Sequence, residues 1–216
     1  SLGTYGAFSF HETKNVISGE GGALIVNDPS KVLEAEIVRE KGTDRSRFLR
    51  GEVDKYTWRS VGSSFLPGEL IAAFLWAQLQ EADEITAIRL AAWDRYYALT
   101  ARLEGDGLLR RPVVPADCTH NAHMFYILLA DGIDRQAVLT GLSEAGVSAV
   151  FHYVPLHSSP AGLELGRSVG SMAVTDHLHG RLIRLPLWCG LTEAQQDRVV
   201  DTLSDLLHSG AVRTAG

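Results

Sequence analysis

The sequence predicts an α/β protein with a buried core. Its 216 residues are 45% hydrophobic and 21% charged, which is enough apolar material for a globular chain and excludes disorder as the main state. Short apolar runs alternate with stretches of helical spacing, most clearly in the second half. Glycine, proline and asparagine punctuate these runs at the expected turns. The length corresponds to one large domain or two small ones.

Two strands are expected near the start. Residues 7–10 form a short apolar run, typical of a buried strand. The glycine-rich turn at residues 19–22 leads into a second apolar run over residues 23–26, also expected as a buried strand. A phosphate-binding loop would require a helix after this turn, so we interpret it as a tight turn.

Helices are expected next. The sequence N-D-P-S at residues 27–30 favours a helix start, and residues 31–41 follow as a helix that stops at a glycine. Residues 42–64 are mostly polar and are expected as a loop. Pro67 suits the first turn of a helix over residues 69–103, which is either kinked or in two pieces.

A segment containing proline and glycine, residues 105–115, is the candidate domain boundary, which gives domains 1–104 and 105–216. Beyond it, strands are expected over residues 124–130, 147–153 and 182–185, and helices over residues 134–145, 171–180 and 192–208. Thr192 and Gln195 have the spacing of a capping box. This half therefore predicts a small α/β domain.

Charge and cysteine content exclude several classes of protein. The net charge of −6 and pI of about 5.7 disfavour a general nucleic-acid binder. No apolar run is long enough to span a bilayer, so no membrane partner is expected. Cys118 and Cys189 form no CxxC pair, which favours a reducing, cytoplasmic location. The opening residues look like the middle of a domain, so we expect a fragment.

Lys14 lies in the polar segment, residues 11–15, that ends the first apolar run. Burial at a strand end would lower the pKa of its amine, and a neutral amine is a nucleophile that can form a Schiff base with an aldehyde. The local pattern by itself favours a solvated lysine in a turn. Five basic residues between positions 39 and 50 offer a contact for a nucleotide diphosphate, although an ordinary solvated loop is slightly preferred.

Residues 9–15 read S-F-H-E-T-K-N, and the G-E-G-G turn follows at residues 19–22. This arrangement resembles the Schiff-base lysine region of the DegT/DnrJ/EryC1/StrS sugar aminotransferases, which are fold-type-I enzymes that use pyridoxal 5′-phosphate (PLP). Further blocks similar to this family lie at residues 39–43, 51–58, 121–126 and 151–157. Together they are most similar to the dTDP-4-amino-4,6-dideoxygalactose branch of enterobacterial common antigen synthesis.

The resemblance implies a role for Lys14 as the covalent anchor of PLP and as the group that moves the proton. It implies that Ser9 contacts the phosphate of PLP. It also implies that residues 1–104 are the end of the large PLP domain with a connecting helix, and that residues 105–216 are the small domain. Ser64 falls where the family has an asparagine that reaches the partner subunit's PLP phosphate, and Leu66 replaces the family's arginine.

Three further residues are expected to bind substrate: Glu20 in the turn, and His152 and His157 in the small domain. A structural histidine is an equally good interpretation of the last two. Cys118 and the nearby histidines lack a fourth ligand at suitable spacing, and the family needs no metal, so none is expected.

The resemblance implies an aminotransferase that moves an amino group, with L-glutamate as the expected donor, to C4 of a dTDP-4-keto-6-deoxyhexose. It also implies a homodimer with shared active sites. One alternative is an inactive piece that serves only in folding or dimerisation, because the family's aspartate beside the pyridine nitrogen is not in this sequence. Another is a different nucleotide-sugar aminotransferase, such as a 3-aminotransferase; a dehydratase would replace Lys14 with histidine.

Overall fold

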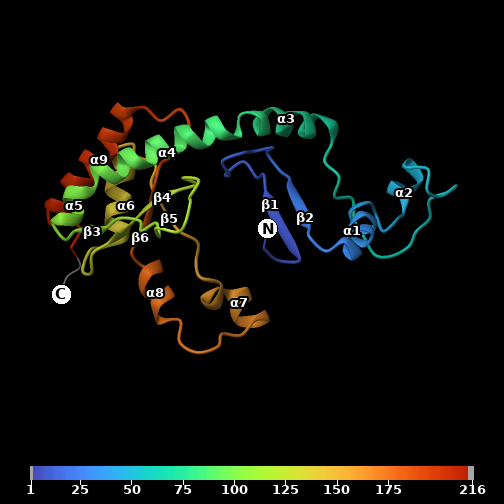
Figure 1. Ribbon diagram of the computed structural model, residues 1–216. Helices are drawn as coiled ribbons and strands as arrows, with labels where there is room; N and C mark the ends of the chain where they lie inside the picture. Colours follow the sequence, from blue (N-terminus) through green and yellow to red (C-terminus); the bar gives the residue numbers. More distant parts are fainter. Residues whose placement is uncertain (1, 214–216) are drawn as a thin grey trace. The chain divides into compact units, whose positions relative to one another are not determined.

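The computed structural model describes residues 2–213 and divides into two compact units, Ser1–Asp83 and Glu84–Gly216 (Figure 1). The division falls inside the helix predicted over residues 69–103. The boundary predicted between residues 104 and 105 rests on composition and stays a prediction. Each unit is described by itself below.

The first unit opens with a β-hairpin. Strand β1 (Tyr5–Ser9) pairs antiparallel with β2 (Gly22–Val26), in a register that sets Ser9 opposite Gly22. Both predicted strands are therefore confirmed, but their predicted burial is wrong. Phe8 and Leu24 are 58% and 59% exposed, because no described residue covers the apolar side chains of this two-stranded sheet.

A short helical region follows the hairpin. It comprises the 3₁₀ turn η1 (Pro29–Lys31), α1 (Val32–Arg39) and α2 (Arg45–Leu49). The Asp28 carboxylate accepts a hydrogen bond from the Ser30 amide at 2.9 Å and so caps η1. Helix α2 lies in the predicted loop 42–64, where five polar-rich residues give no periodic pattern to recognise.

The long helix predicted over residues 69–103 is in three pieces: α3 (Glu69–Gln80), α4 (Ala82–Leu99) and α5 (Ala101–Gly105). Thr100 marks the second break. Its hydroxyl donates to the Tyr96 carbonyl oxygen at 2.7 Å, a bond that competes with the helix backbone and favours a bend. Helix α3 buries none of its side chains.

The second unit contains a four-stranded antiparallel sheet in the order β3-β4-β6-β5. The strands are β3 (Leu109–Arg110), β4 (Phe125–Leu129), β5 (Val150–Phe151) and β6 (Leu182–Leu185). The predictions for β4 and β6 are confirmed within one residue at each end. The strand predicted over 147–153 is only two residues long, and β3 lies in the predicted linker.

The other elements of the second unit are α6 (Arg135–Glu144), η2 (Leu156–Ser158), α7 (Pro160–Leu165), α8 (Ala173–His179) and α9 (Glu193–His208). Asp134 caps α6, and Thr192 with Gln195 forms the predicted capping box of α9. Helix α7 is too short to show a sequence periodicity and was not predicted.

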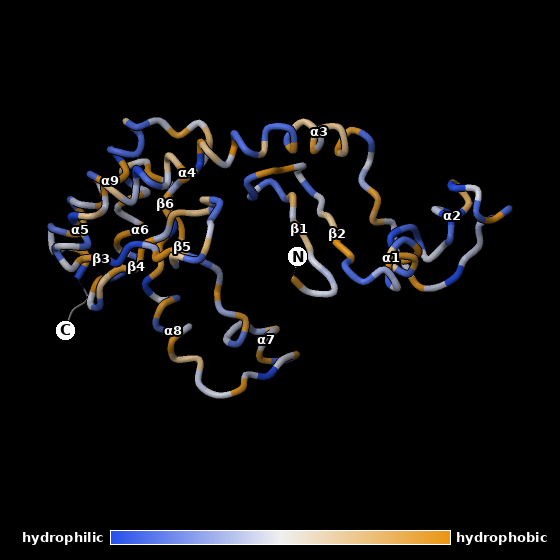
Figure 2. Tube along the Cα trace, in the orientation of Figure 1, coloured by the Kyte–Doolittle hydropathy of each residue, from blue (hydrophilic) through white to orange (hydrophobic). Residues whose placement is uncertain are grey.

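The hydrophobic core lies entirely in the second unit among the described residues. Apolar side chains of β4 and β6 pack with those of α4, α6 and α9. Figure 2 colours the Cα trace of these elements by hydropathy, with hydrophobic residues in orange. The largest fully buried members are Tyr96, Phe125, Leu103, Ile127, Leu129, Leu142, Ile183, Leu203, Leu207 and Val138. The second unit is thus α/β and has its own core, and it includes α5 and nearly all of α4, while the predicted small domain over residues 105–216 stays a prediction.

Candidate functional site

The loop between β1 and β2 has a defined backbone. The amides of Phe10 and Glu12 donate to the carbonyl oxygens of Gly21 and Gly19 at 2.9 and 2.8 Å. Inside the loop the buried Ser18 hydroxyl donates to the Glu20 carbonyl oxygen at 2.9 Å. These bonds fix the loop across its full width, so the residues at its tip have defined positions.

Lys14 lies at the tip of this loop. Its amide donates to the His11 carbonyl oxygen at 2.9 Å, and its side chain is half-buried. Among the described residues, no carboxylate lies within ion-pair distance of the Lys14 amine. The amine is therefore held on an ordered backbone without an ionic partner.

The structure brings Ser9 and Glu20 to the same loop. The Ser9 hydroxyl oxygen accepts a hydrogen bond from the His11 amide at 3.4 Å. The His11 imidazole lies 3.6 Å from the Glu20 carboxylate. His11 thus connects three of the predicted site residues, a role that sequence reasoning missed. The sequence signal that could have identified His11 is its position within the family-like block at residues 9–15.

The glycine-rich turn allows close backbone approach, as its sequence predicted. A Cβ atom on Gly22 would lie 2.7 Å from the carbonyl oxygen of Phe8, and one on Gly21 would lie 2.6 Å from the Ser18 hydroxyl. Side chains at these positions would push the hairpin apart, so glycine is required for the loop to close.

Ser64 lies in an extended segment beside the end of α1. It pairs with Glu40 in an isolated antiparallel bridge and is exposed. The preceding Gly62 packs against backbone: a Cβ there would overlap the Gly42 amide nitrogen and lie 2.7 Å from the Val38 carbonyl oxygen. The position of Ser64 is thus well defined by backbone, while its expected reach to a partner subunit stays a prediction.

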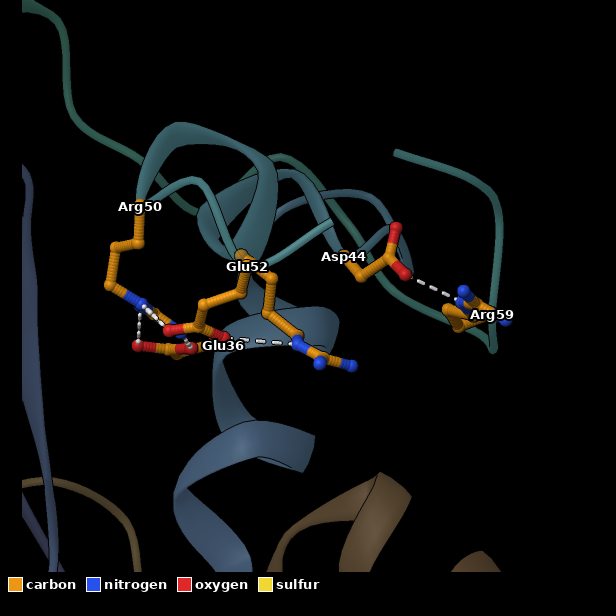
Figure 3. A network of polar contacts seen from close by, with 6 residues as sticks. Glu36, Asp44, Arg50, Glu52 and Arg59 are labelled. Atoms are coloured by element: carbon orange, nitrogen blue, oxygen red, sulfur yellow. Dashed lines mark hydrogen bonds and ion pairs between the residues drawn. The ribbon is translucent and has the colours of Figure 1, made fainter. Parts of the chain in front are cut away.

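The basic stretch near α2 is largely paired within the first unit (Figure 3). Arg50 donates two parallel hydrogen bonds to Glu36 at 2.8 and 2.9 Å and a third to Glu52 at 2.6 Å. Arg50 thereby lowers the pKa of the Glu52 carboxyl. Separately, Arg59 donates to Asp44 at 2.6 Å. These ion pairs favour the interpretation of a solvated structural region over a nucleotide contact.

The two predicted histidines lie in the second unit. His157 contacts the Asp176 carboxylate on α8, with Nε2 2.8 Å from Oδ1. His152 follows β5, and its buried Nδ1 has no hydrogen-bond partner among the described residues. Burial lowers the pKa of the His152 imidazole, and nearby Arg184 and His179 lower it further.

Further features of the described residues that bear on candidate sites are the cysteines, the metal-ligating side chains and the apolar helices. Cys118 and Cys189 are both free and exposed. No group of three or more metal-ligating side chains occurs within residues 2–213. None of the helices in that range combines the length and apolar character needed to cross a membrane.

Comparisons with known proteins give the chain its family. The DegT/DnrJ/EryC1/StrS aminotransferase family matches residues 1–204. GDP-perosamine synthase of Caulobacter vibrioides is 30% identical over 211 residues, which cover 96% of this chain and 53% of that protein. The dTDP-3-amino-3,4,6-trideoxy-alpha-D-glucose transaminase of Micromonospora megalomicea is 29% identical over 204 residues, covering 93% and 52%.

The fold is likewise found in solved structures. A sugar aminotransferase of Streptococcus pneumoniae, solved in PMP-form and PLP-form, superposes in its PMP-form with a TM-score of 0.84 at 20% identity, covering 97% of this chain and 54% of that one. The chain therefore spans about half the length of the relatives it matches, and the predicted fold-type-I class is confirmed. By sequence and by fold, this chain belongs to the DegT/DnrJ/EryC1/StrS aminotransferase family.

Proposed function

We propose that this chain contributes the reactive lysine of a PLP-dependent aminotransferase that acts on a nucleotide-linked keto-sugar. The observation that carries the proposal is the placement of Lys14. It lies at the tip of a hydrogen-bonded loop, half-buried, with no ionic partner for its amine among the described residues. A lysine that served only to solubilise a turn would need no such ordered backbone.

The residues around Lys14 suit PLP chemically. A primary amine can bond to the aldehyde of PLP, and the exposed Ser9 hydroxyl at the end of β1 can donate to its phosphate. When bound, PLP would supply an electron-withdrawing ring that stabilises negative charge on the substrate carbon. Lys14 and Ser9 are the residues of this chain that we expect to hold it.

In the proposed reaction the protein's own groups position the substrate and move a proton. Once released from the cofactor, the Lys14 amine would act as general base and then as general acid at its Nζ. The loop bonds of Phe10 and Glu12 order the backbone that carries this lysine. Glu20 at the loop and His152 and His157 in the second unit are proposed substrate contacts, and Ser64 is a proposed phosphate contact across a homodimer.

The finer substrate assignment rests on the sequence blocks that resemble the dideoxygalactose branch. We propose transfer from L-glutamate to C4 of a dTDP-4-keto-6-deoxyhexose, in the cytoplasm. The named relatives make GDP-perosamine and a dTDP-3-amino sugar, so both the nucleotide and the ring position vary among similar proteins. A direct comparison of C3-keto and C4-keto substrates with both nucleotides would separate these alternatives.

Trapping of PLP tests the role of Lys14. These 216 residues contain four lysines, Lys14, Lys31, Lys41 and Lys55, so a PLP adduct that borohydride fixes within them can be assigned by peptide mapping. We expect one adduct, on Lys14, in the full-length protein. Lys14→Ala should remove the adduct and lower turnover at least about 100-fold, the lower end of what a positioned general base contributes.

Lys31→Ala is the matched control, because Lys31 is bound to Glu34 at 3.6 Å on the exposed side of η1. It should keep both the adduct and turnover. The same trapping on this 216-residue chain tells whether it forms a usable pocket by itself. Labelling only in the full-length protein would support the alternative of an inactive piece, and equal labelling of all four lysines in both would overturn the assignment of Lys14.

A further inference from the structure

Four buried side-chain nitrogen atoms of the second unit have no hydrogen-bond partner among the described residues, and three of them belong to residues that lie in or next to β5, β6 and α8. These three are Nδ1 of His152, Nδ1 of His179 and Nε of Arg184. The Nε–H of arginine is a permanent donor, because the guanidinium does not lose its proton in proteins. Burying such a donor without an acceptor costs free energy, so the buried Nε–H of Arg184 indicates that an acceptor binds there.

The three residues come from separate elements near the β5 edge of the sheet. Arg135 links α8 to β5, because it donates to the His179 carbonyl oxygen and its guanidinium carbon lies 5.5 Å from the centroid of the Phe151 ring. Arg184 lies in β6 opposite Val150, and its Nη2 donates to the Phe151 carbonyl oxygen at 3.2 Å. His152 follows directly after β5. His152 and Arg184 both contact Tyr153. The centroid of the Tyr153 ring lies 5.3 Å from that of the His152 ring and 5.7 Å from the Arg184 guanidinium carbon.

The charges in this cluster are uniformly basic. The groups that act on the His152 imidazole are Arg184 on β6 and His179 at the end of α8, and both disfavour its protonation. On α8, the Asp176 carboxylate is already bound by His157 at 2.8 Å. A further guanidinium, that of Arg135, binds the His179 carbonyl oxygen. Basic groups from β6, α6 and α8 thus gather here, and the Asp176 carboxylate on α8 is paired with His157.

We propose that Arg184, His152 and His179 form a binding site for an oxyanion, either a carboxylate or a phosphoryl group. Such a ligand would accept from Arg184 Nε–H and from the Nδ1–H of the two imidazoles, giving all three nitrogens a charge-assisted partner. The site lies wholly within the second unit and includes His152, so as a substrate subsite it rests on the proposed function, while binding of the anion itself does not require Lys14.

Binding at this site is coupled to the protonation of His152. The bound negative charge would offset the repulsion from Arg184 and His179, so it raises the pKa of the imidazole. By linkage, the anion binds more tightly as the pH falls through the His152 titration. This coupling gives a spectroscopic signature that a merely structural cluster would lack.

The test is a titration of the 216-residue chain, labelled at histidine, followed by the NMR signals of the imidazole ring. Inorganic phosphate and glutarate are added separately, with chloride at matched ionic strength as the reference. We expect saturable shifts of His152 and His179 with at least one oxyanion, and an upward shift of the His152 pKa. Response to phosphate only, or to glutarate only, identifies the ligand class.

Arg184→Gln should weaken the binding at least about tenfold, as expected for loss of a charge-assisted hydrogen bond. Arg184→Lys keeps the charge but loses the Nε donor, so it should also weaken binding. It replaces Arg184→Gln as the test variant if Arg184→Gln does not fold. Arg102→Gln is the matched control, since that side chain is exposed. Shifts no larger than those with chloride, or shifts unchanged in both Arg184 variants, would overturn the proposal.

Discussion

At the scale of single residues, Asp44 shows how the first unit compensates for its lack of an apolar core. Its buried carboxylate accepts from the Thr57 amide at 2.7 Å and from Arg59 at 2.6 Å. The hydrogen bond from the Thr57 amide, and then the one from the Arg59 guanidinium, lower the pKa of this carboxyl below its ordinary value. The ion pair joins the start of α2 to the segment after it, 13 to 15 residues along the chain.

A lowered pKa means that the ionised Asp44 stabilises the fold. The sign follows from linkage: the stabilisation is complete above the ordinary aspartate pKa of about 3.9 and is lost as the pH falls through the lower folded pKa. The Thr57 amide shift should therefore titrate below that ordinary value. Asp44→Asn should abolish the transition and Arg59→Gln should raise its midpoint. A midpoint at or above the ordinary value in the unsubstituted chain would contradict this account.

At the scale of elements, the capping box of α9 is a local signal that the structure bears out. The Gln195 amide donates to the Thr192 hydroxyl at 3.3 Å, and the Thr192 amide donates to the Gln195 side-chain oxygen at 2.9 Å. Thr192→Ala should lower the free energy of unfolding by about 1 kcal/mol, measured by urea denaturation of the chain. Thr192→Ser should retain most of the capping contribution to the free energy of unfolding, because serine also has a side-chain hydroxyl.

Thr202→Ala provides the contrast on the same helix. Thr202 lies in the interior of α9 and its hydroxyl bonds only to the Arg198 carbonyl oxygen, so alanine there should be neutral or slightly stabilising. If both threonines tolerated alanine equally, the capping contribution would be refuted.

The elements that sequence predicted well are those with strong local signals. Strand β6 coincides with an apolar run, and α6 and α9 begin at capping residues. The elements that were missed are short or depend on distant partners. Helix α2 is held by Asp44 through bonds to Thr57 and Arg59, and β3 is defined by its pairing with β4.

The same limit applies to the candidate site. Ser9, Glu20 and Lys14 fall within one stretch of the sequence and the hairpin brings them to one loop, while their roles stay predictions. The unpartnered nitrogens of His152, His179 and Arg184 come from separate elements, and only the pairing of β5 with β6 and the position of α8 bring them together. No spacing rule along the chain could have grouped these three residues.

At the scale of the whole molecule, the two units differ in what holds them together. Every buried hydrophobic side chain of the described residues belongs to the second unit. In the first unit the buried side chains are polar, and large apolar ones such as Leu70 and Trp76 are exposed. Since burial of apolar surface is the main stabilising contribution to folding, the first unit should open locally at much lower free energy than the second.

This difference predicts an ordered pattern of trypsin cleavage in the isolated chain. The first unit carries the arginines between positions 39 and 59, and the next arginines, Arg89 and Arg95, lie in or beside the core. Cleavage up to Arg59 should be on the order of tenfold or more faster than at Arg89, because local opening there costs at least about 1.4 kcal/mol less. Mass spectrometry should detect an early product that begins at Ser60.

Digestion in a urea concentration that unfolds the chain is the control, and under it the preference for the early sites should disappear. Early products that begin at Leu90, formed as fast as those that begin at Ser60, would show that the second unit opens as readily as the first. In that case the buried side chains of β4, β6, α6 and α9 would not form a cooperative core, because a packed core of this kind opens only near the global free energy of unfolding.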